Sequence, residues 1–261
     1  MIIDYDIRQL MPYINWDYFF YAWGMHNKPL AERQKLWQEA VSILSDLDGH
    51  YKAYALFLLM DAHSEGDDIV LSDGRRIPLL RQQQVGSVCL CLADFLRPDH
   101  DRIGLFATTV DMGLEKDFVH DTYMKMMVQL LADRLAEAAA ECMHEAVRKT
   151  YWGYAPNEQL TMQQLHSEQF QGIRPAVGYP SLPDTSINFV LNELLDFHQI
   201  GIRLTESGAM RPHASVSGFM MSHPEARYFA VGTIGNDQLA DYARRRSVPI
   251  EVMRKFLISN L

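Results

Sequence analysis

The sequence contains few cysteines and no long hydrophobic segment. Its three cysteines are an odd set, so they do not form the disulfide framework that is typical of small secreted proteins. The longest apolar run, Tyr54–Met60, is too short to cross a bilayer. The N-terminal stretch carries acidic side chains among its apolar ones, which is not the pattern of a signal peptide. We therefore expect a cytoplasmic protein whose cysteines, Cys89, Cys91 and Cys142, are buried thiols.

Positive charge is also scarce. The chain of 261 residues has 24 lysines and arginines against 33 aspartates and glutamates, which gives a formal net charge of −9. A protein that neutralises the phosphates of a nucleic acid needs clustered basic side chains. The one dense basic run, Arg244–Arg246, is more typical of a solvated helix face than of a docking patch. Nucleic acid is therefore not an expected partner.

Several common enzyme motifs are missing as well. There is no G-x-G-x-x-G dinucleotide fingerprint, no Walker A sequence and no G-x-S-x-G nucleophile elbow. The run from His144 to Arg148 partly matches a zinc protease helix, but its second ligand position holds the arginine, which does not bind zinc. We interpret His144 instead as a histidine on a helix surface, beside a Glu145–Arg148 ion pair.

The residues that are present indicate a folded protein. Hydrophobic residues make up 48% of the chain and charged residues 22%, so enough apolar surface exists to offset the entropy lost on folding. No repeat, low-complexity segment or Gly/Ser-rich linker divides the sequence. We therefore expect one domain over residues 1–261.

Hydrophobic spacing predicts both helices and paired strands. The clearest pattern is an apolar stripe in a helix at 117–149, and Ser72-Asp73-Gly74 predicts a hairpin turn. Because strands pair through hairpins and helices come in blocks, the expected class is α+β with a mainly antiparallel sheet. An aromatic-rich segment at 17–23 leads into a helix at 32–47, and 151–183 is loop-rich. Further helices are expected at 187–198, 237–246 (with Asn236 as N-cap) and 249–258, and strands at 54–60, 69–71, 75–79, 102–110, 215–222 and 228–234.

Five ordered segments, spread over nearly the whole chain, carry a family likeness. One six-residue match would be weak, whereas ordered matches at compatible spacing are strong evidence. In these segments the chain resembles the C-terminal activation domain of cobalamin-dependent methionine synthase. The segments are Tyr13–Trp16 with Phe19–Phe20; Leu80–Gln83 with Cys91–Phe95; Ala132–Ala138, continuing through His144-Glu145 and Arg148 to Tyr151–Tyr154; Gly172–Pro180, which reads GIRPAVGYP; and Leu204–Ser207, Ser215–Gly218 and Ser222–Val231.

This resemblance implies both a fold and an activity. The family's domain is a C-shaped α+β fold with a twisted, mainly antiparallel sheet flanked by helices, and it binds S-adenosylmethionine (AdoMet) in a shallow groove. It caps the cobalamin module after that cofactor has oxidised to inert cob(II)alamin. An electron from flavodoxin and a methyl group from AdoMet then regenerate methylcobalamin. We therefore expect an AdoMet-binding reactivation subunit that supports reductive methylation of a cobalamin held by its partner.

The resemblance accounts for the whole chain, so the homocysteine, folate and cobalamin modules are expected on another chain. The expected partners are the cobalamin-binding module of methionine synthase, on which the chain would act in trans, and flavodoxin or a similar electron donor. The chain would then supply the AdoMet site without forming a complete active site alone. Two alternatives stay open. One is an interaction module that docks on a corrinoid protein with weak or no AdoMet binding, and the other is service to a different corrinoid methyltransferase.

The R-P-A-x-G-Y motif is implied to hold the ligand. Its arginine is Arg174 here, and a planar guanidinium suits carboxylates and other paired acceptors. The motif also contains Ala176, Gly178, which permits a positive φ, and Tyr179. On the residues alone, a structural role in which Arg174 closes a salt bridge and Tyr179 packs a loop is an equally good interpretation.

Other positions are implied by the same resemblance. Arg134 and Glu137 lie one helical turn apart in the D-R-L-A-E stretch and are expected to pair while lining the groove. Asp133 is expected to face the cobalamin module and its displaced histidine. A plain solvated helix face is the alternative for all three. The family's ligand-binding aromatic pair, which lies in its last strand, is Tyr228-Phe229 here.

The sequence departs from the family pattern at two places. Asn15 stands where the family commonly has an aspartate that binds AdoMet. Asparagine still accepts a hydrogen bond from the ligand's ammonium, but hydrogen bonds to charged groups contribute about 1.5–3 kcal/mol against about 1 for neutral ones, so we expect weaker affinity. The family's acidic-His-Thr-Glu-Lys run is replaced by Asp184–Asn188, which puts any interdomain role of that run in doubt.

Overall fold

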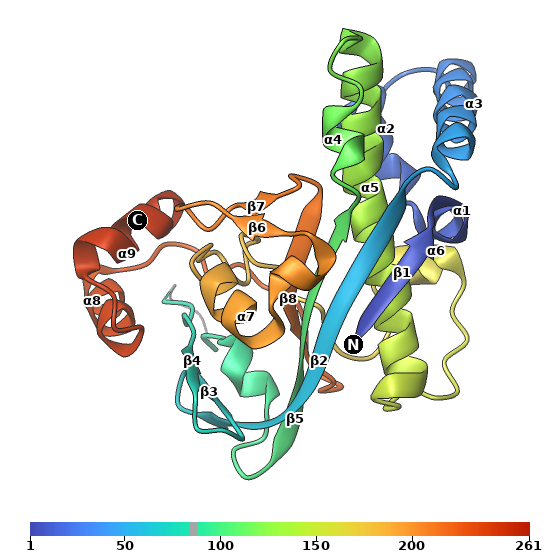
Figure 1. The fold of residues 1–261 in the computed structure, drawn as a ribbon. Helices are drawn as coiled ribbons and strands as arrows, with labels where there is room; N and C mark the ends of the chain where they lie inside the picture. The colour runs from blue at the N-terminus through green and yellow to red at the C-terminus, as the bar shows by residue number, and fades with distance from the viewer. Residues whose placement is uncertain (84–87) are drawn as a thin grey trace.

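The computed structural model describes residues 1–83 and 88–261 (Figure 1). The strands are β1 (Ile2–Asp6), β2 (Lys52–Glu65), β3 (Asp68–Leu71), β4 (Arg76–Pro78), β5 (Asp101–Val110), β6 (Arg203–Leu204), β7 (Met210–Arg211) and β8 (Ser215–Met220). The α-helices are α1 (Ile7–Leu10), α2 (Trp16–Ala22), α3 (Leu30–Leu47), α4 (Gly113–Lys116), α5 (Thr122–Ala146), α6 (Met162–His166), α7 (Ile187–Leu195), α8 (Asn236–Arg245) and α9 (Ile250–Phe256). Short 3₁₀ turns are η1 (Met11–Tyr13), η2 (Leu92–Phe95), η4 (Phe197–Ile200) and η5 (Ile258–Asn260), and η3 (Val147–Tyr151) is a π-helical turn that continues α5.

Six of the described strands form one antiparallel sheet. Its order is β4–β3–β2–β5–β8, and β1 joins it beside β2. β1 and β3 pair with opposite ends of one edge of β2, while β5 runs along the other edge. The β3–β4 hairpin turns at Gly74, whose φ of +85° confirms the turn predicted from the sequence. β6 and β7 form a separate two-stranded hairpin.

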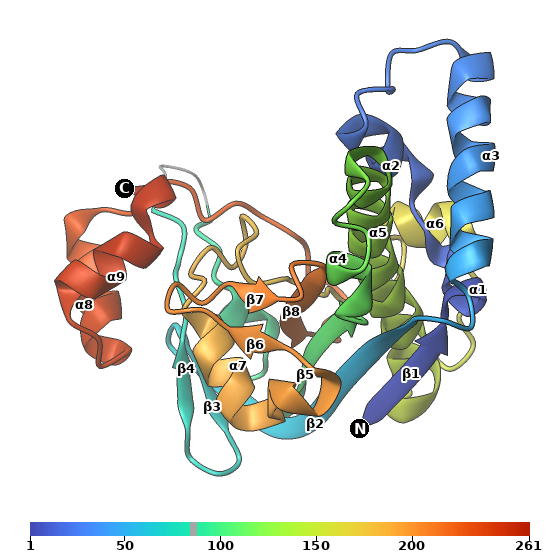
Figure 2. The same ribbon diagram turned by 45° about the horizontal axis from the view of Figure 1, so that its top comes forward.

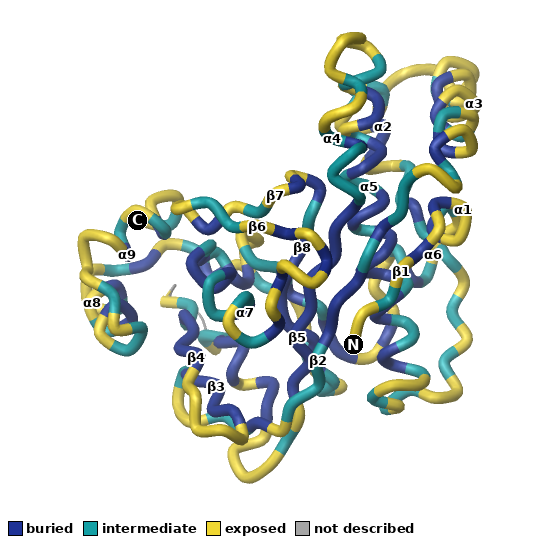
Figure 3. The backbone as a smooth tube through the Cα atoms, viewed as in Figure 1, coloured by how far each residue is buried: buried dark blue, intermediate teal, exposed yellow. Residues whose placement is uncertain are grey.

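The alternation of side chains along β5 divides the interior between two faces of the sheet. Phe106 packs in the cluster that contains the apolar stripe of α5, whereas its neighbours Leu105 and Ala107 join the cluster under α7. A third cluster holds α8 and α9 together around Tyr242. Figure 2 shows α2 and α3 beside α5 at one side of the molecule, with α8 and α9 at the opposite side. Buried residues follow the central strands and the facing side of α5 (Figure 3).

The expected fold class is confirmed. The chain is α+β, with a curled antiparallel sheet flanked by helices in the C-shaped arrangement that was expected. The predicted helix at 117–149 corresponds to α5, which begins after Asp121; the Asp121 side chain accepts a hydrogen bond from the N–H of Met124 at 3.0 Å. Among the described residues, no helix has the length and apolar character needed to span a membrane.

The prediction of a strand at 228–234 is wrong. This segment runs without a ladder partner in the described structure, and its N–H groups donate to loops: Val231 to the carbonyl of Pro180 at 2.9 Å and Ile234 to that of Asn260 at 2.7 Å. The edge of β8 that such a strand needs is occupied by the segment 173–177 instead. Tertiary packing decides which of the two segments, 173–177 or 228–234, lies along the edge of β8. The local sequence pattern of 228–234 therefore could not predict the outcome.

Two smaller predictions at the C-terminus are also wrong. Asn236 is the first residue of α8, and Gly235 precedes it as the N-cap. The basic run is not a solvated face as a whole, because only Arg244 is well exposed. Arg245 forms ion pairs with Asp68 and Asp241, and Arg246 is buried against Asp184 at 2.8 Å. These side chains tie α8 to the loops beneath it.

Candidate functional site

The segment around Arg174 is held against the free edge of β8 like an additional short strand. Ile173 and Met221 exchange two backbone hydrogen bonds of 2.9 and 3.0 Å. Gly218 permits this close approach, since a Cβ there would lie only 2.1 Å from the carbonyl oxygen of Pro175. The backbone on both sides of Arg174 is thus fixed by main-chain contacts alone.

The guanidinium of Arg174 points at α5. Its Nη2 donates to Glu141 Oε2 at 3.2 Å and its Nη1 to His144 Nδ1 at 3.1 Å. Burial alone would lower the pKa of Arg174, but nearby carboxylates, led by Glu141, raise it above its usual value, so the group stays charged. The salt bridge considered from the sequence is therefore present. It does not close the site, because Arg174 also lines an open cleft.

Glu141 keeps one oxygen atom without a partner. Its Oε1 is buried and accepts no hydrogen bond from any described residue, while Oε2 is engaged by Arg174. A buried acceptor left in this state costs about 1–3 kcal/mol. Such an atom calls for an explanation, and the usual ones are a ligand, an ion or a water. Because Glu141 lines the same cleft as Arg174, a donor that enters the cleft would complete its hydrogen bonds.

The prediction that His144 lies on a helix surface is wrong. The imidazole is fully buried, and Arg148 Nη1 donates to its Nδ1 at 2.9 Å. Arg148 is also fully buried and makes two hydrogen bonds of 2.8 and 2.7 Å with Glu158. The expected partner Glu145 pairs instead with Lys149 at 3.2 Å. The reason is tertiary, since the loop after α5 folds back and brings Glu158 against this face of the helix.

An open cleft lies beside Arg174, between α2, α5 and the segment 174–181. It consists of two adjoining hollows of about 330 and 440 Å³, a size typical of small-molecule sites. The first is lined mainly by polar side chains, and the second includes Pro175, Ala176, Val216 and Phe229. We call the two hollows together the Arg174 cleft. Both are lined by Tyr18, Glu137, Glu168, Arg174 and Tyr179.

Arg134 and Glu137 both line the cleft but do not form the expected pair within the described structure. The hydroxyl of Tyr179 donates to Glu137 Oε1 at 3.0 Å. The Glu137 carboxylate, together with burial, raises the pKa of Tyr179 to about 12, so the hydroxyl keeps its proton. The guanidinium of Arg134 lies over the ring of Tyr18, 5.9 Å from its centroid. Each charge therefore has an aromatic neighbour at the cleft.

The two members of the aromatic pair, Tyr228 and Phe229, are held by different hydrogen bonds. The hydroxyl of Tyr228 accepts a hydrogen bond from the backbone N–H of Arg174 at 2.9 Å, and burial raises the pKa of Tyr228. Phe229 is held by its backbone, whose N–H donates to Ser181 Oγ at 3.0 Å. Both rings belong to the lining of the less polar hollow. This part of the cleft is thus bordered by two aromatic residues, each held by a hydrogen bond between a backbone N–H and a hydroxyl.

The remaining motif residues have different roles. Ala176 bridges Gly218 on β8 and lines the less polar hollow. Gly178 has a φ of +87° and donates its N–H to the carbonyl of Leu182 at 2.8 Å. It therefore shapes the turn that presents Tyr179 and is set back from the cleft wall.

Asn15 lines the polar hollow and also caps α2. Its Oδ1 accepts a hydrogen bond from the N–H of Asp17 at 3.2 Å. An amide oxygen has two lone pairs, so one acceptor position remains for a ligand. The two uses compete for the orientation of one side chain.

The charged and aromatic residues that line the cleft but were not expected there from the sequence include Tyr18, Glu141 and Glu168. The spacing of Glu141, one helical turn after Glu137, is a signal that could have found it. Glu168 carries no such signal, because it reaches the cleft from a loop. Its φ of +57° is unusual for a residue with a side chain, and burial raises its pKa. Such strained positions concentrate at functional sites.

Comparison with known proteins identifies the family. The family model for the vitamin B12 dependent methionine synthase, activation domain, matches residues 6–247. The chain belongs to this family. A solved structure described as the MetH reactivation domain bound to AdoHcy matches it with a TM-score of 0.93 and 39% sequence identity. That match covers 100% of this chain and 90% of the other.

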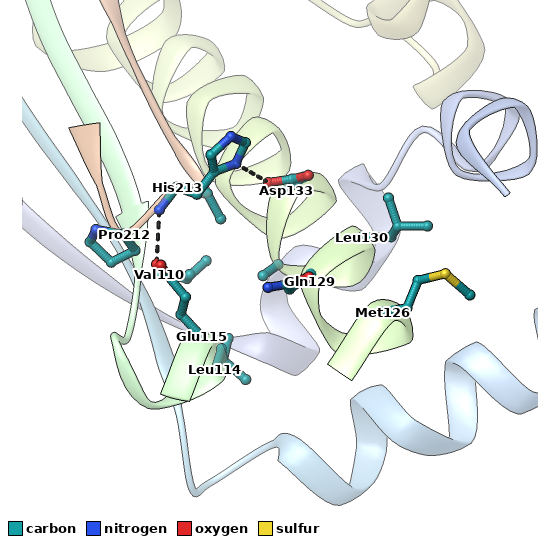
Figure 4. Close-up of a pocket in the computed structure, with 11 residues that line it drawn as sticks. Val110, Leu114, Glu115, Met126, Gln129, Leu130, Asp133, Pro212 and His213 are labelled. Carbon is teal, nitrogen blue, oxygen red and sulfur yellow. Dashed lines mark hydrogen bonds and ion pairs between the residues drawn. The ribbon is translucent and has the colours of Figure 1, made fainter. Parts of the chain in front are cut away.

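Asp133 of this activation domain lies at a different pocket, of about 370 Å³ (Figure 4). Its Oδ1 is 3.7 Å from His213 Nδ1, and the backbone N–H of His213 donates to Glu115 Oε2 at 3.0 Å. Burial raises the pKa of Asp133, although His213 opposes the shift. The pocket is mostly apolar, and no arginine is among the described residues that line it, whereas a carboxylate ligand is best bound by such a cation. The apolar lining of this pocket at Asp133 includes Val110, Leu114, Met126 and Leu130.

Proposed function

We propose that the Arg174 cleft binds AdoMet and that the chain supports the reductive methylation that reactivates a cobalamin-dependent methionine synthase. One observation carries this proposal: the charged guanidinium of Arg174 binds Glu141 Oε2, while the buried Oε1 of the same carboxylate has no donor among the described residues. Together they match the amino acid end of AdoMet, which offers one carboxylate and one ammonium. The AdoHcy named for the similar MetH structure supports a ligand of this class.

The rest of the cleft suits the other parts of AdoMet. Glu137 and Glu168 place carboxylates near a sulfonium. Tyr228 and Phe229 offer ring faces to an adenine. Asn15 adds a neutral acceptor on the polar side, next to Glu141. We infer that the polar hollow takes the amino acid end and the less polar hollow takes the nucleoside.

The chain's contribution is alignment. AdoMet would supply a methyl group and leave as S-adenosylhomocysteine, and the partner's corrinoid, once reduced by one electron from flavodoxin, would supply the electron pair that accepts the methyl group. Arg174 is positioned by its neighbours Ile173 and Ala176, which pair with β8, and Glu141 by α5. Because the ligand is held in one orientation, much of the translational and rotational entropy cost of bringing the reactants together is met on binding, and the barrier to methyl transfer is lower. We assign no acid–base role to any residue of the cleft.

We further propose that the chain acts in trans in the cytoplasm, on the cobalamin-binding module of a methionine synthase and with flavodoxin as electron donor. Asp133 is the residue that we expect to face that module. About a third of its side chain is exposed, 32%, at the rim of its pocket. Its contact with His213 is long and solvent-exposed, so a partner can displace it without a large loss of energy.

Reactivation of an oxidised methionine synthase tests the function. The synthase used lacks its own activation domain, and the assay adds this chain, AdoMet and reduced flavodoxin. We expect turnover to return only when all three are present. If turnover stays absent while the chain binds AdoMet, the proposal that its partner is a methionine synthase fails. The same assay with another corrinoid methyltransferase then tests the alternative partner.

A second candidate function is a docking module with weak or no AdoMet binding. It is favoured by Asn15, which is neutral and whose oxygen already caps α2. Calorimetry with AdoMet and capture of a cobalamin-carrying protein separate the two candidates. Capture without measurable AdoMet binding supports the docking module, and AdoMet binding with reactivation supports the main proposal.

A further inference from the structure

Two guanidinium groups converge on a single ring nitrogen of His144. Its Nδ1 lies 2.9 Å from Arg148 Nη1 and 3.1 Å from Arg174 Nη1. A guanidinium has only donors, so Nδ1 must be unprotonated and accept from both. The other ring nitrogen, Nε2, then carries the proton and donates to the hydroxyl of Tyr154 at 3.3 Å. The contacts thus define one tautomer of a neutral imidazole.

The environment of His144 keeps the ring neutral. Burial lowers its pKa well below the usual value, and the positive charges of Arg174 and Arg148 lower it further. The groups that face the ring are these two arginines, the Tyr154 hydroxyl and the Phe170 ring, which makes a T-shaped contact with a centroid separation of 5.1 Å. None of these contacts favours an imidazolium.

A neutral acceptor fixes a cation without cancelling its charge. Glu137 and Glu168 stand at the same cleft as Arg174, and a guanidinium that is free to move would be drawn to them. We propose that His144 is a positioning residue for AdoMet: while Glu141 accepts from Nη2 of Arg174, His144 accepts from Nη1, holds the guanidinium away from Glu137 and Glu168, and leaves its remaining N–H groups for the ligand's own carboxylate. This inference rests on the proposed function of the Arg174 cleft.

The anchor behind His144 is itself rigid. Arg148 is fully buried, makes two hydrogen bonds with Glu158 and lies over the ring of Phe170, 4.2 Å from its centroid. Glu141, His144 and Arg148 follow one another at helical spacing at the end of α5 and in the π turn. The carboxylate, the acceptor and the anchor therefore move as one body, which preserves the geometry around Arg174.

Three variants separate positioning from structural support. His144→Phe keeps a ring and removes the acceptor, whereas His144→Asn keeps an acceptor, its Oδ1, close to the position of Nδ1. Tyr154→Phe is the matched control, because it removes a half-buried hydrogen-bond partner of the same ring, at Nε2 and not at the Nδ1 that contacts Arg174. Each variant is titrated by calorimetry with AdoMet and with 5′-methylthioadenosine, which lacks the amino acid end. Thermal unfolding is recorded in parallel.

We expect His144→Phe to weaken AdoMet binding about ten-fold or more, the scale of a hydrogen bond to a charged group. Its affinity for 5′-methylthioadenosine should equal that of the wild type, because that probe has no carboxylate. His144→Asn should restore most of the AdoMet affinity. Tyr154→Phe should lose stability and keep its affinity for AdoMet.

Several results would overturn the inference. Equal AdoMet binding by wild type and His144→Phe, or equal losses with both probes, removes the positioning role while the proposed function stands. A wild type that binds no AdoMet overturns the function and the inference together. Should His144→Phe fail to fold, nitrogen-15 spectra of the wild-type imidazole decide: Nδ1 must be the unprotonated nitrogen, and its signal must shift with AdoMet and not with 5′-methylthioadenosine.

Discussion

Arg246 and Arg174 are both buried against acidic residues, yet their surroundings differ. Arg246 Nη1 donates to Asp184 Oδ2 at 2.8 Å, and its Nη2 donates to Ser186 Oγ at 3.2 Å. Tyr242 completes the cluster by donating to the same carboxylate at 2.8 Å. Both oxygens of Asp184 accept hydrogen bonds, and its side chain is only 1% exposed. This cluster is complete within the chain.

The Arg174 cluster is incomplete by comparison. One oxygen of Glu141 has no donor among the described residues, and the guanidinium borders an open cleft. The two clusters use the same residue types, so composition does not separate them. What separates them is whether every buried lone pair is satisfied. A buried ion pair with complete partners ties the fold together, and one with an unfilled partner beside an opening indicates a ligand.

The largest effect is expected from Arg246→Ala. The substitution leaves the carboxylate of Asp184 buried without its cation, which costs about 3–5 kcal/mol in free energy of unfolding. Urea unfolding measures the loss, and AdoMet affinity should be unchanged while the protein is folded. Arg244→Ala is the control from the same basic run, because Arg244 is exposed and its pair with Asp241 contributes only about 0–1 kcal/mol. Similar losses in the two variants would contradict the difference in stability that is expected between a buried and an exposed arginine.

Arg174→Ala is expected to act on binding more than on stability. Loss of a charge-assisted hydrogen bond of about 1.5–3 kcal/mol corresponds to an AdoMet affinity about ten- to a hundred-fold weaker. The loss of stability should be smaller than that of Arg246→Ala, because water in the open cleft reaches Glu141 once the guanidinium is gone. Calorimetry and urea unfolding of both variants give the two numbers. Unchanged AdoMet binding would remove Arg174 from the site.

Asn15→Asp is expected to strengthen AdoMet binding while leaving the stability of the fold unchanged. It adds a negative charge at the polar hollow, and a charged acceptor should tighten AdoMet binding about three- to ten-fold. Aspartate and asparagine cap helices about equally well, so the melting temperature should stay within a degree or two. Titration of both proteins with AdoMet at the same ionic strength tests the gain. An unchanged affinity would mean that this side chain does not reach the ligand.

Asp133→Asn is expected to have the smallest effect, visible as a pH dependence. Burial raises the folded-state pKa of Asp133 above its unfolded value. The protonated carboxyl therefore favours the folded state at low pH, and that contribution is lost as the pH rises through the folded-state pKa. Asparagine does not titrate. The melting temperature of the variant minus that of the wild type should rise between pH 3 and pH 6, and a difference that falls over this range would contradict the direction of the shift.

The strongest local patterns predicted elements well. The stripe of α5 and the turn at Gly74 each depend on residues close in sequence, where spacing and glycine chemistry decide the outcome. The cleft-lining positions Arg134, Glu137 and Arg174 follow from motif likeness, and the structure brings them to one opening. Their partners did not follow, since Glu137 bonds with Tyr179 and not with Arg134.

The sequence by itself determined the α+β class, the family and the motif that contains Arg174. Only the tertiary structure decided that 173–177, and not 228–234, lies along the edge of β8. It also decided that His144 is buried and that one oxygen of Glu141 has no donor in the part of the chain that the structure describes. These outcomes depend on which distant segment packs most favourably against a strand edge or a helix face. Local propensity cannot predict such outcomes, because the free energy that decides them comes from contacts between residues far apart in the chain.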